Sequence, residues 1–487
     1  MAYYKIENMD NCLTVRDMVL RSGEVFSERD AYRFERQGVD CAVSFKQFAE
    51  DYRGLCVYLA QKCSAGSHIG ICAGNSYEWI LSYTAAMDIG VAVPISVETD
   101  SKEMEYLCSK ADITAVFAHN EQFGLFGDGV EILDISQMQK YIDEGKALIS
   151  QGAQMPPAKD EKALCEILFT SGTTGAKRGV MLSSANIMSI VKSSFPNLIG
   201  SLTLSALPFS HGFEAVCHIL ASLNPGVTVC IAKSNLRYAY EMVKYQPQSI
   251  YLVPMQAAGL LTVFSALFEK CKGNLKTIVC GGAAINAGLY EGFAAAGIRL
   301  LAGYGLSECS PLVSLNTDGT VGSAGKAAPY CKVRISEGGL IEVKGDNVME
   351  GYYKDEKATK AAFTPDGWLI TGDLGRLTEQ GDIFITGRVK NLIILPNGEN
   401  IIPEEVEEVL SRYLPGGSDF IVLEDEEKLA VQLYVGEMTE QEALAVLKKA
   451  VDEANTVLPT FKRISKTLIR NTPYEKTALG KIKREIK

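Results

Sequence analysis

Short apolar runs rich in β-branched residues alternate along the chain with segments of helical periodicity. The apolar runs cover residues 68–72, 91–95, 114–118, 228–232, 249–253 and 276–280. The helical patterns between them include residues 76–89, 238–245 and 287–296. This alternation predicts an α/β fold with mostly parallel sheets. Residues 120–162 have weak periodicity, and we expect them to form a peripheral excursion.

Two later regions have a different pattern. Over residues 319–387, glycine turns separate short strands at 333–335, 340–343, 368–371 and 383–386, which predicts a compact β unit. The last hundred residues predict a helix at 404–413, strands at 420–423 and 429–435, a helix at 440–455 and a strand at 465–470. We therefore expect a large, multi-layered N-terminal domain over residues 1–388 and a small, mobile α+β C-terminal domain over residues 389–487.

Composition narrows the class of protein. The chain has 487 residues, of which 47% are hydrophobic and 22% charged, as in soluble globular proteins. A net charge of −11 argues against nucleic acid as the main partner. We expect no transmembrane segment, because Asp88 and Pro94 interrupt the most apolar stretch. Thirteen cysteines without CxxC pairs favour reduced, mostly buried thiols in a cytoplasmic protein.

The most informative segment is LFTSGTTGAKRGV, residues 168–180. Its glycines let the backbone approach a ligand, and successive backbone N–H groups can form an anion-binding concavity. Hydroxyl groups add neutral donors, and Lys177 adds a positive charge. This chemistry suits a polyphosphate, although no Walker A spacing is present. Taken alone, the segment is more typical of a glycine-rich surface turn, but the segments described below agree with phosphate binding.

A second segment, GYGLSECSPL, combines an aromatic ring with a carboxylate. Tyr304 offers a flat surface for a purine base, Ser307 a hydroxyl group, and Glu308 an oxygen ligand of the kind that Mg²⁺ prefers. The alternative is a loop aromatic residue beside a solvated glutamate.

Three further segments carry charged groups. Asp373 in WLITGDLGRL follows a glycine at the end of an apolar run, where an acidic residue can accept both ribose hydroxyls or form an Asx turn. Arg388 can bind phosphate or ribose oxygens through its planar guanidinium. At the C-terminus, Lys481 follows Gly480, whereas Lys483, Arg484 and Lys487 could form a solvated basic tail.

In this order, these segments resemble the motifs of the adenylate-forming superfamily, which includes acyl-CoA synthetases, peptide-synthetase adenylation domains and firefly-type luciferases. TSGTTGAKRG resembles the phosphate loop, GYGLSE the YGxTE motif with Ser307 in place of threonine, and TGDL the ribose motif. GRVKNLI with NGENIIPEEVE resembles the hinge, and GKIKR the catalytic-lysine motif. The resemblance covers essentially the whole chain.

The resemblance implies that ATP and a carboxylic acid form an acyl-adenylate and pyrophosphate, after which a thiol takes the acyl group. It places Mg²⁺ on Glu308, the hinge at Lys390, and catalytic roles on Lys481, Glu308, Ser307 and His211. It assigns nucleotide binding to Thr170, Ser171, Gly172, Thr173, Thr174, Gly175, Lys177, Gly281, Gly282, Ala283, Tyr304, Gly305, Asp373 and Arg388.

The segment LPFSHGFE, residues 207–214, resembles the part of the family that borders the acyl pocket. Phe209 and Ser210 stand where amino-acid adenylation domains carry an aspartate, so we expect an apolar acid, fatty or aromatic, and not an α-amino acid. The expected pocket wall is apolar or small: Phe213, Val216, Val253, Met255, Ala302 and Cys309.

Coenzyme A is the expected thiol acceptor, and the phosphopantetheine of a carrier protein is the alternative. Two other classes remain as hypotheses. One is a non-catalytic protein that binds nucleotide or acyl-adenylate, and the other is a phosphotransferase, which would release no pyrophosphate.

Overall fold

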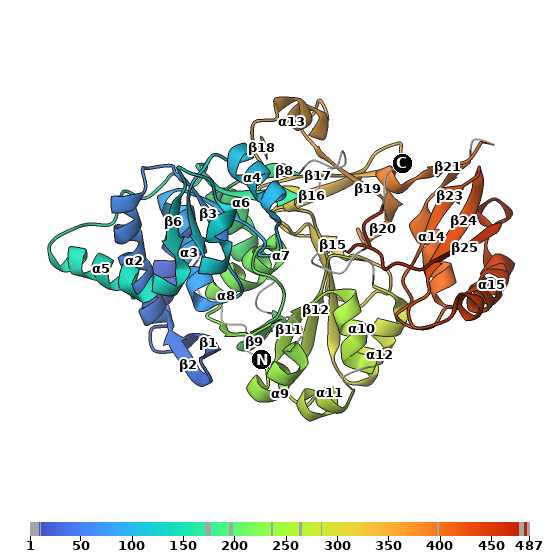
Figure 1. The fold of residues 1–487 in the computed structure, drawn as a ribbon, viewed down its shortest axis with the longest axis horizontal. Helices are drawn as coiled ribbons and strands as arrows, with labels where there is room; N and C mark the ends of the chain where they lie inside the picture. The colour runs from blue at the N-terminus through green and yellow to red at the C-terminus, as the bar shows by residue number, and fades with distance from the viewer. Residues whose placement is uncertain are drawn as a thin grey trace.

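A nine-stranded sheet forms the centre of the chain (Figure 1). The structure is a computed structural model that describes residues 9, 11–170, 177–193, 198–234, 237–262, 265–283, 285–396, 399–476 and 482–484. Strands β1, β10, β9, β11, β12 and β13 run parallel, which confirms the mostly parallel arrangement expected from the sequence. The strand order is β15 (Lys326–Ala327), β14 (Ser314–Asn316), β13 (Arg299–Tyr304), β12 (Thr277–Cys280), β11 (Ser249–Leu252), β9 (Leu202–Ser205), β10 (Thr228–Ile231), β1 (Asp30–Arg36) and β2 (Val39–Ser44).

A second, seven-stranded sheet lies beside the first. Its order is β18 (Gly351–Tyr352), β8 (Arg178–Ser183), β7 (Leu164–Thr170), β4 (Val91–Pro94), β3 (His68–Cys72), β5 (Ile113–Ala118) and β6 (Glu131–Asp134). Residues 120–162 form its edge strand β6 and the helix α5 (Met138–Ser150), so this region lies at the periphery, as expected, but is folded.

Apolar residues connect five layers: two sheets, a layer of helices between them, and helices on the outer face of each sheet. One cluster joins both sheets to α1 (Val15–Val25), α2 (Phe45–Lys62), α3 (Tyr77–Ile89) and α6 (Ser184–Val191), and also to the segment α7 (Gly212–Glu214), η4 (Ala215–Leu220) and α8 (Ala221–Leu223). A second cluster covers the outer face of the nine-stranded sheet with α9 (Tyr238–Tyr245), α10 (Pro254–Thr262), α11 (Ser265–Cys271) and α12 (Ala287–Ala295). A third places α4 (Ser101–Lys110) on the outer face of the other sheet.

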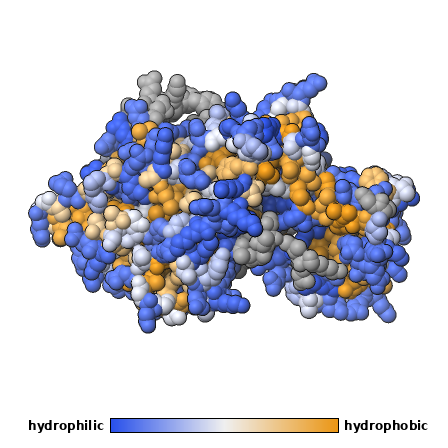
Figure 2. Space-filling model, turned by 90° about the horizontal axis from the view of Figure 1, so that it is seen from above, coloured by the Kyte–Doolittle hydropathy of each residue, from blue (hydrophilic) through white to orange (hydrophobic). Residues whose placement is uncertain are grey.

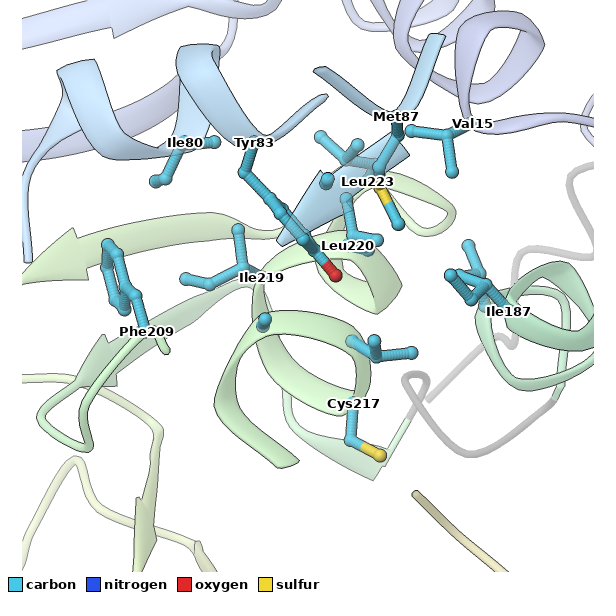
Figure 3. Close-up of a cluster of buried hydrophobic side chains, with 14 of the residues drawn as sticks. Val15, Ile80, Tyr83, Met87, Ile187, Phe209, Cys217, Ile219, Leu220 and Leu223 are labelled. Atoms are coloured by element: carbon cyan, nitrogen blue, oxygen red, sulfur yellow. The ribbon is translucent and has the colours of Figure 1, made fainter. Parts of the chain in front are cut away.

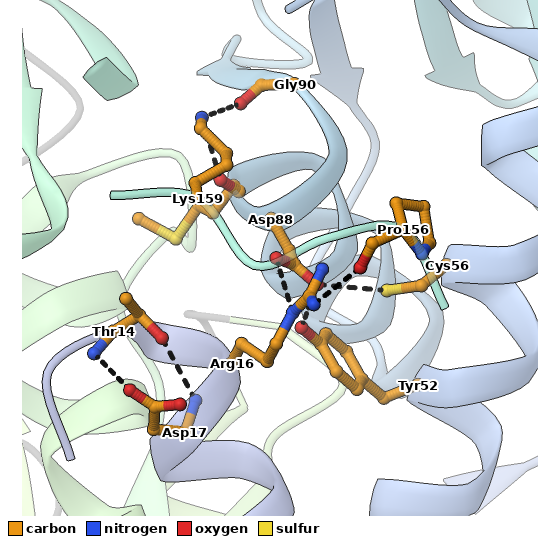
Figure 4. Close-up of polar contacts among 10 residues, drawn as sticks. Thr14, Arg16, Asp17, Tyr52, Cys56, Asp88, Gly90, Pro156 and Lys159 are labelled. Carbon is orange, nitrogen blue, oxygen red and sulfur yellow. Dashed lines mark hydrogen bonds and ion pairs between the residues drawn. The ribbon is translucent and has the colours of Figure 1, made fainter. Parts of the chain in front are cut away.

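Helix α3 lies in the central layer and is buried on nearly all sides. Ser76 caps its start, and its one buried carboxylate, Asp88, receives the Arg16 guanidinium at 2.8 Å and the Tyr52 hydroxyl at 2.6 Å (Figure 4). Lys159 donates to the carbonyl oxygens of Gly90 and Leu164, both at 2.6 Å. These polar contacts tie three helices and a loop together inside the apolar layer.

The predicted β unit is present as an antiparallel four-stranded sheet. Its strands are β16 (Cys331–Ile335), β17 (Leu340–Gly345), β19 (Leu369–Leu377) and β20 (Ile383–Arg388), and α13 (Glu356–Ala362) precedes β19. The same region supplies β14 and β15 to the nine-stranded sheet and β18 to the seven-stranded sheet. The β unit therefore connects the two large sheets.

The last hundred residues form a C-terminal unit with its own apolar cluster, whose buried members run from Ile393 to Ile464. The 3-10 turn η6 (Val389–Asn391) leads into it from β20. Its elements are β21 (Ile393–Ile394), β22 (Asn400–Ile401), α14 (Pro403–Ser411), β23 (Phe420–Asp425), β24 (Lys428–Tyr434), α15 (Glu440–Val457), η7 (Thr460–Lys462) and β25 (Lys466–Arg470). The α+β pattern expected here is confirmed.

The surface mixes polar and apolar residues (Figure 2). Near the start of the C-terminal unit, Ile385, Val389 and Ile394 are exposed apolar residues. No helix of the described residues is long and apolar enough to cross a membrane. Ten of the thirteen cysteines are buried, as expected for small core residues.

Candidate active site

Four neighbouring parallel strands end at one edge of the nine-stranded sheet. Strands β9, β11, β12 and β13 lie side by side in the same direction, so the segments that follow them meet. These segments are residues 206–213 after β9, Val253 after β11 and Gly281–Gly282–Ala283 after β12, while Tyr304 ends β13. The carboxyl edge of parallel strands is where α/β proteins bind nucleotides.

A buried carboxylate lies between a tyrosine and an arginine at this edge. The Tyr304 hydroxyl donates to Asp373 at 2.9 Å, and Arg388 Nε lies 2.6 Å from the other carboxylate oxygen. Asp373 and Arg388 are paired residues on β19 and β20, so the sheet register sets their approach. Burial and the Asp373 carboxylate raise the pKa of Tyr304, which keeps its hydroxyl a donor. The Tyr304 ring is largely buried.

Glu308 lies in the 3-10 turn η5 (Ser307–Cys309) and faces the seven-stranded sheet. Tyr352 on β18 donates to its carboxylate at 2.9 Å, and β18 pairs with β8. Arg178 lies over the Tyr352 ring, 5.3 Å from its centre. Gly305 makes this path possible, since a Cβ there would lie 1.7 Å from the Pro311 carbonyl oxygen. Glu308 is therefore brought next to the hairpin that carries the glycine-rich segment.

That hairpin is formed by β7 and β8, with Thr170 opposite Arg178. Lys177, at the start of β8, pairs with Glu103 of α4, and the Tyr106 hydroxyl donates to the Lys177 carbonyl oxygen at 2.8 Å. Thr170 and Lys177 are the described members of the expected phosphate loop. The other proposed members lie outside the described residues: Ser171, Gly172, Thr173, Thr174 and Gly175.

His211 caps α7, and its Nδ1 accepts the Phe213 backbone N–H at 3.4 Å. Burial lowers the pKa of His211 to about 4, so the ring is neutral at pH 7. The preceding loop is fixed by Asn75, which donates to the Leu207 carbonyl oxygen at 2.7 Å and accepts from Phe209 N at 2.9 Å. His211 and Phe213 are thus held rigidly beside the strand ends.

The expected pocket wall is mostly buried. The Phe213 ring lies under Gly281, where a Cβ would come within 3.1 Å of its Cζ atom, so a larger residue at this position would require the ring to shift. Met255 differs from the other wall candidates because 54% of its surface is exposed at the start of α10. It does not close the pocket in this structure. The candidates that are buried are Phe213, Val216, Val253, Ala302 and Cys309.

Lys481 lies outside the described residues, but both ends of the segment that carries it are anchored on the C-terminal unit. Lys476 and Ile482 form a β-bridge, and Lys483 N donates to the Glu475 carbonyl oxygen at 2.8 Å. Arg484 is not part of a solvated tail, because it pairs with Glu407 and donates to the Val422 carbonyl oxygen at 2.9 Å. The solvated-tail interpretation is therefore wrong for Arg484.

Sequence reasoning missed Tyr352, Glu103, Tyr106 and the clamping role of Asn75. Each reaches its partner over 44 to 134 positions of sequence. No local motif carries these contacts, since sheet pairing and helix packing create them.

Together these features describe an α/β protein of the nucleotide-binding kind, with its candidate site at the ends of parallel strands. The chain belongs to the AMP-binding enzyme family, because that family's model matches residues 20–353. The model of the AMP-binding enzyme C-terminal domain matches residues 390–486. The family and the enzyme class expected from the motifs are confirmed.

Relatives and solved structures agree with this assignment. The chain is 28% identical over 445 residues to a long-chain-fatty-acid–CoA ligase of Mycobacterium bovis, covering 76% of this chain and 73% of that protein. It is 28% identical over 473 residues to long-chain-fatty-acid–CoA ligase 5 of Rattus norvegicus, covering 77% and 68%. The fold is similar to that of O-succinylbenzoate CoA synthetase of Bacillus subtilis in complex with AMP, with a TM-score of 0.81, 23% identity and 96% of both chains covered.

Proposed function

We propose that the protein is an AMP-forming acid–CoA ligase. It would activate a carboxylic acid with ATP to an acyl-adenylate, release pyrophosphate, and transfer the acyl group to the thiol of CoA. The observation that carries this proposal is the convergence of Gly281–Ala283, Tyr304, Asp373 and Arg388 at one sheet edge in a chain of the AMP-binding family.

In this proposal Asp373 and Arg388 hold the ribose, and Tyr304 with residues 281–283 borders the adenine. Thr170, Lys177 and the loop between them bind the β- and γ-phosphates. Glu308 fits a Mg²⁺ ligand, because its carboxylate faces the phosphate hairpin and is fixed by the Tyr352 hydroxyl. Bound there, Mg²⁺ would neutralise charge on the phosphates. Lys481 would bring a positive charge to the carboxylate and α-phosphate as they approach.

We propose an apolar acid, fatty or aromatic, as the substrate. Phe209 and Phe213 are buried beside His211, and the adjacent acidic side chain, Glu214, is bonded through one oxygen to Ser205 and His218. Glu214 is therefore not offered as a partner for an α-ammonium group. The long-chain relatives support a fatty acid, whereas the O-succinylbenzoate enzyme supports an aromatic one. CoA is favoured over a carrier protein because these relatives are named as CoA ligases.

We propose a domain boundary at residues 388–389, with rotation about Lys390 between the two half-reactions. The separate apolar cluster of the C-terminal unit supports it. A cytoplasmic location is part of the same proposal, supported by thirteen cysteines that are mostly buried and form no CxxC pairs.

The test is an acid-dependent product assay. The protein is incubated with ATP, Mg²⁺, hydroxylamine and one acid from a panel of acetate, octanoate, palmitate, benzoate and leucine. The proposal expects hydroxamate, AMP and pyrophosphate with an apolar acid and little with leucine. Formation of ADP and orthophosphate with every acid would contradict the reaction, and a clear preference for leucine would contradict the substrate class.

A further inference from the structure

A ring of four buried polar side chains lies directly behind the acid side of the proposed site. Thr203 and Ser205 project from the same face of β9, and Glu214 and His218 meet them from the segment α7–η4. His218 Nε2 lies 2.9 Å from Thr203 Oγ1, and His218 Nδ1 lies 2.9 Å from Glu214 Oε1. The Ser205 hydroxyl donates to the same glutamate oxygen. The exposed fraction of all four residues is 0%.

The hydrogen atoms of this ring can be assigned by counting. The single hydroxyl proton of Thr203 is used toward the Ser249 carbonyl oxygen at 3.2 Å. Thr203 must then accept from His218, so Nε2 carries a proton. One further proton lies between His218 Nδ1 and Glu214 Oε1, whichever atom holds it. The ring is therefore neutral as a whole and rigid, which a buried polar group requires.

Aromatic side chains connect the four polar side chains to the proposed site. The Tyr251 ring stacks on His218 with centres 3.9 Å apart and planes 10° apart, and its hydroxyl donates to the Cys217 carbonyl oxygen at 3.1 Å. Phe213 packs on Tyr251 with centres 5.5 Å apart and lies under Gly281. A path of direct contacts thus runs from Glu214 to the residue that borders both the acid and the nucleotide.

The backbone around this path is unusual. Residues 215–220 form the π-helical turn η4, a rare geometry that occurs frequently at functional sites. Figure 3 shows Cys217, Ile219 and Leu220 of this turn packed in the apolar cluster with Phe209 and Tyr83. The polar ring fixes the inner side of the turn, and the apolar cluster fixes its outer side.

We propose that Glu214 and His218 are positioning residues that set the orientation of Phe213, and through it which acid fits the site. This inference rests on the proposed function. Neither residue touches the substrate. Phe213 lies between Tyr251 and Gly281. Weakening the hydrogen bonds of the four polar side chains would therefore tilt the Phe213 phenyl group toward or away from the acid. Gly281 stays fixed by strand pairing, so nucleotide binding changes less.

The variant Glu214→Gln tests this inference. Since Thr203 keeps a proton on His218 Nε2, the amide must turn its NH₂ group toward Nδ1, which leaves the Ser205 hydroxyl without its acceptor. We expect the KM of the best acid to rise about ten-fold and the ratio of octanoate to palmitate turnover to change, because displacements of this kind alter acid discrimination by about 10-fold or more. The KM of ATP should stay within about two-fold of wild type.

Glu166→Gln is the matched control. Glu166 is also fully buried with one hydrogen-bonded oxygen, accepting from Tyr83 at 2.7 Å, but it is not part of the aromatic path. Its acid preference should equal that of wild type. Tyr251→Leu is the second variant, in case Glu214→Gln does not fold, because it removes the ring between His218 and Phe213. It should change acid preference in the same way, and the combined variant should show less than the sum of both effects.

The outcomes separate the two proposals. An altered acid preference in Glu214→Gln or Tyr251→Leu, with folding confirmed by circular dichroism and unchanged preference in Glu166→Gln, supports the inference. An active wild type whose acid preference is the same in all variants overturns the inference and leaves the proposed function standing. A wild type that releases no pyrophosphate with any acid overturns both.

Discussion

The large unit and the C-terminal unit hold their functional residues in different ways. In the large unit, Asp373 is locked between Tyr304 and Arg388, and Glu308 is fixed by Tyr352, so side chains from distant strands hold one another. In the C-terminal unit, the described residues that flank Lys481 contact residues of that same unit, as Lys483 does with Glu475 and Arg484 with Glu407.

This difference indicates that the two units have different roles in the proposed reaction. The groups proposed to bind the nucleotide are preset by sheet register and would need no rearrangement before the ligand arrives. The C-terminal unit has its own apolar cluster, which supports the proposed change of position without unfolding. Under the proposed function, Lys481 would serve one reaction step and be withdrawn for the next.

The largest expected effect concerns Lys481→Ala. Losing one preorganised charge contact typically costs about 2.7–4 kcal/mol, roughly a hundred- to thousand-fold in rate. We expect that loss in acyl-adenylate formation, and little loss in thioester formation from a pre-made acyl-adenylate. Single-turnover kinetics of both steps measure it, with the exposed neighbour Lys483→Ala as the control. Equal losses in both steps would make the segment structural.

The next effect concerns the connection between the units. Lys390→Pro restricts the backbone in η6, where rotation is proposed, and removes an N–H group. We expect thioester formation to slow by about ten-fold or more while adenylation changes little. Lys390→Ala, which removes the charge but keeps the backbone free, should behave like wild type. If alanine slows the second step as much as proline does, the side chain and not the rotation is responsible.

A third effect concerns the preset site. Asp373→Asn keeps the shape but removes the charge that faces Arg388, and hydrogen bonds to charged groups contribute about 1.5–3 kcal/mol. AMP binding should weaken by roughly ten-fold or more, measured by isothermal titration calorimetry. Asp382→Asn is the control, since Asp382 is also buried in the β unit but contacts Thr378. Unchanged AMP affinity in Asp373→Asn would remove Asp373 from the nucleotide site.

The last effect is on stability and leaves the reaction rate aside. Burial raises the pKa of Glu166 to about 8, well above the value of an unfolded glutamate. The folded state therefore binds the additional proton, and stability falls as pH rises from about 4.5 toward 8, by up to about 1.4 kcal/mol per pH unit. Glu166→Gln should flatten this part of the pH profile of urea unfolding. A variant with the wild-type slope would show that another group causes it.

Much of the fold was predictable because its elements have strong local signals. The buried strand β3 and the helix α9 begin and end where the apolar pattern predicts. The segment 120–162 was harder, because edge strand β6 and helix α5 bury only a few side chains each, so their periodicity is weak. Its peripheral place was predicted, and its folded structure was not.

The site was predictable only as separate motifs. The sequence places Tyr304, Asp373 and Arg388 in three separate segments. Their contact depends on the pairing of β19 with β20, which brings Arg388 to the Asp373 carboxylate. Glu103 and Tyr352 had no signal, since their partners depend on packing between a helix and two sheets. The expected solvated tail was wrong for Arg484, because a basic run gives no sign of its half-buried partner Glu407.

The most direct test of the central claim is identification of the nucleotide products formed by wild-type protein with ATP, Mg²⁺ and CoA in the presence and absence of each apolar acid. The account predicts AMP, pyrophosphate and acyl-CoA in equal amounts, all dependent on the acid. ADP with orthophosphate, or AMP formed at the same rate without acid, would contradict it.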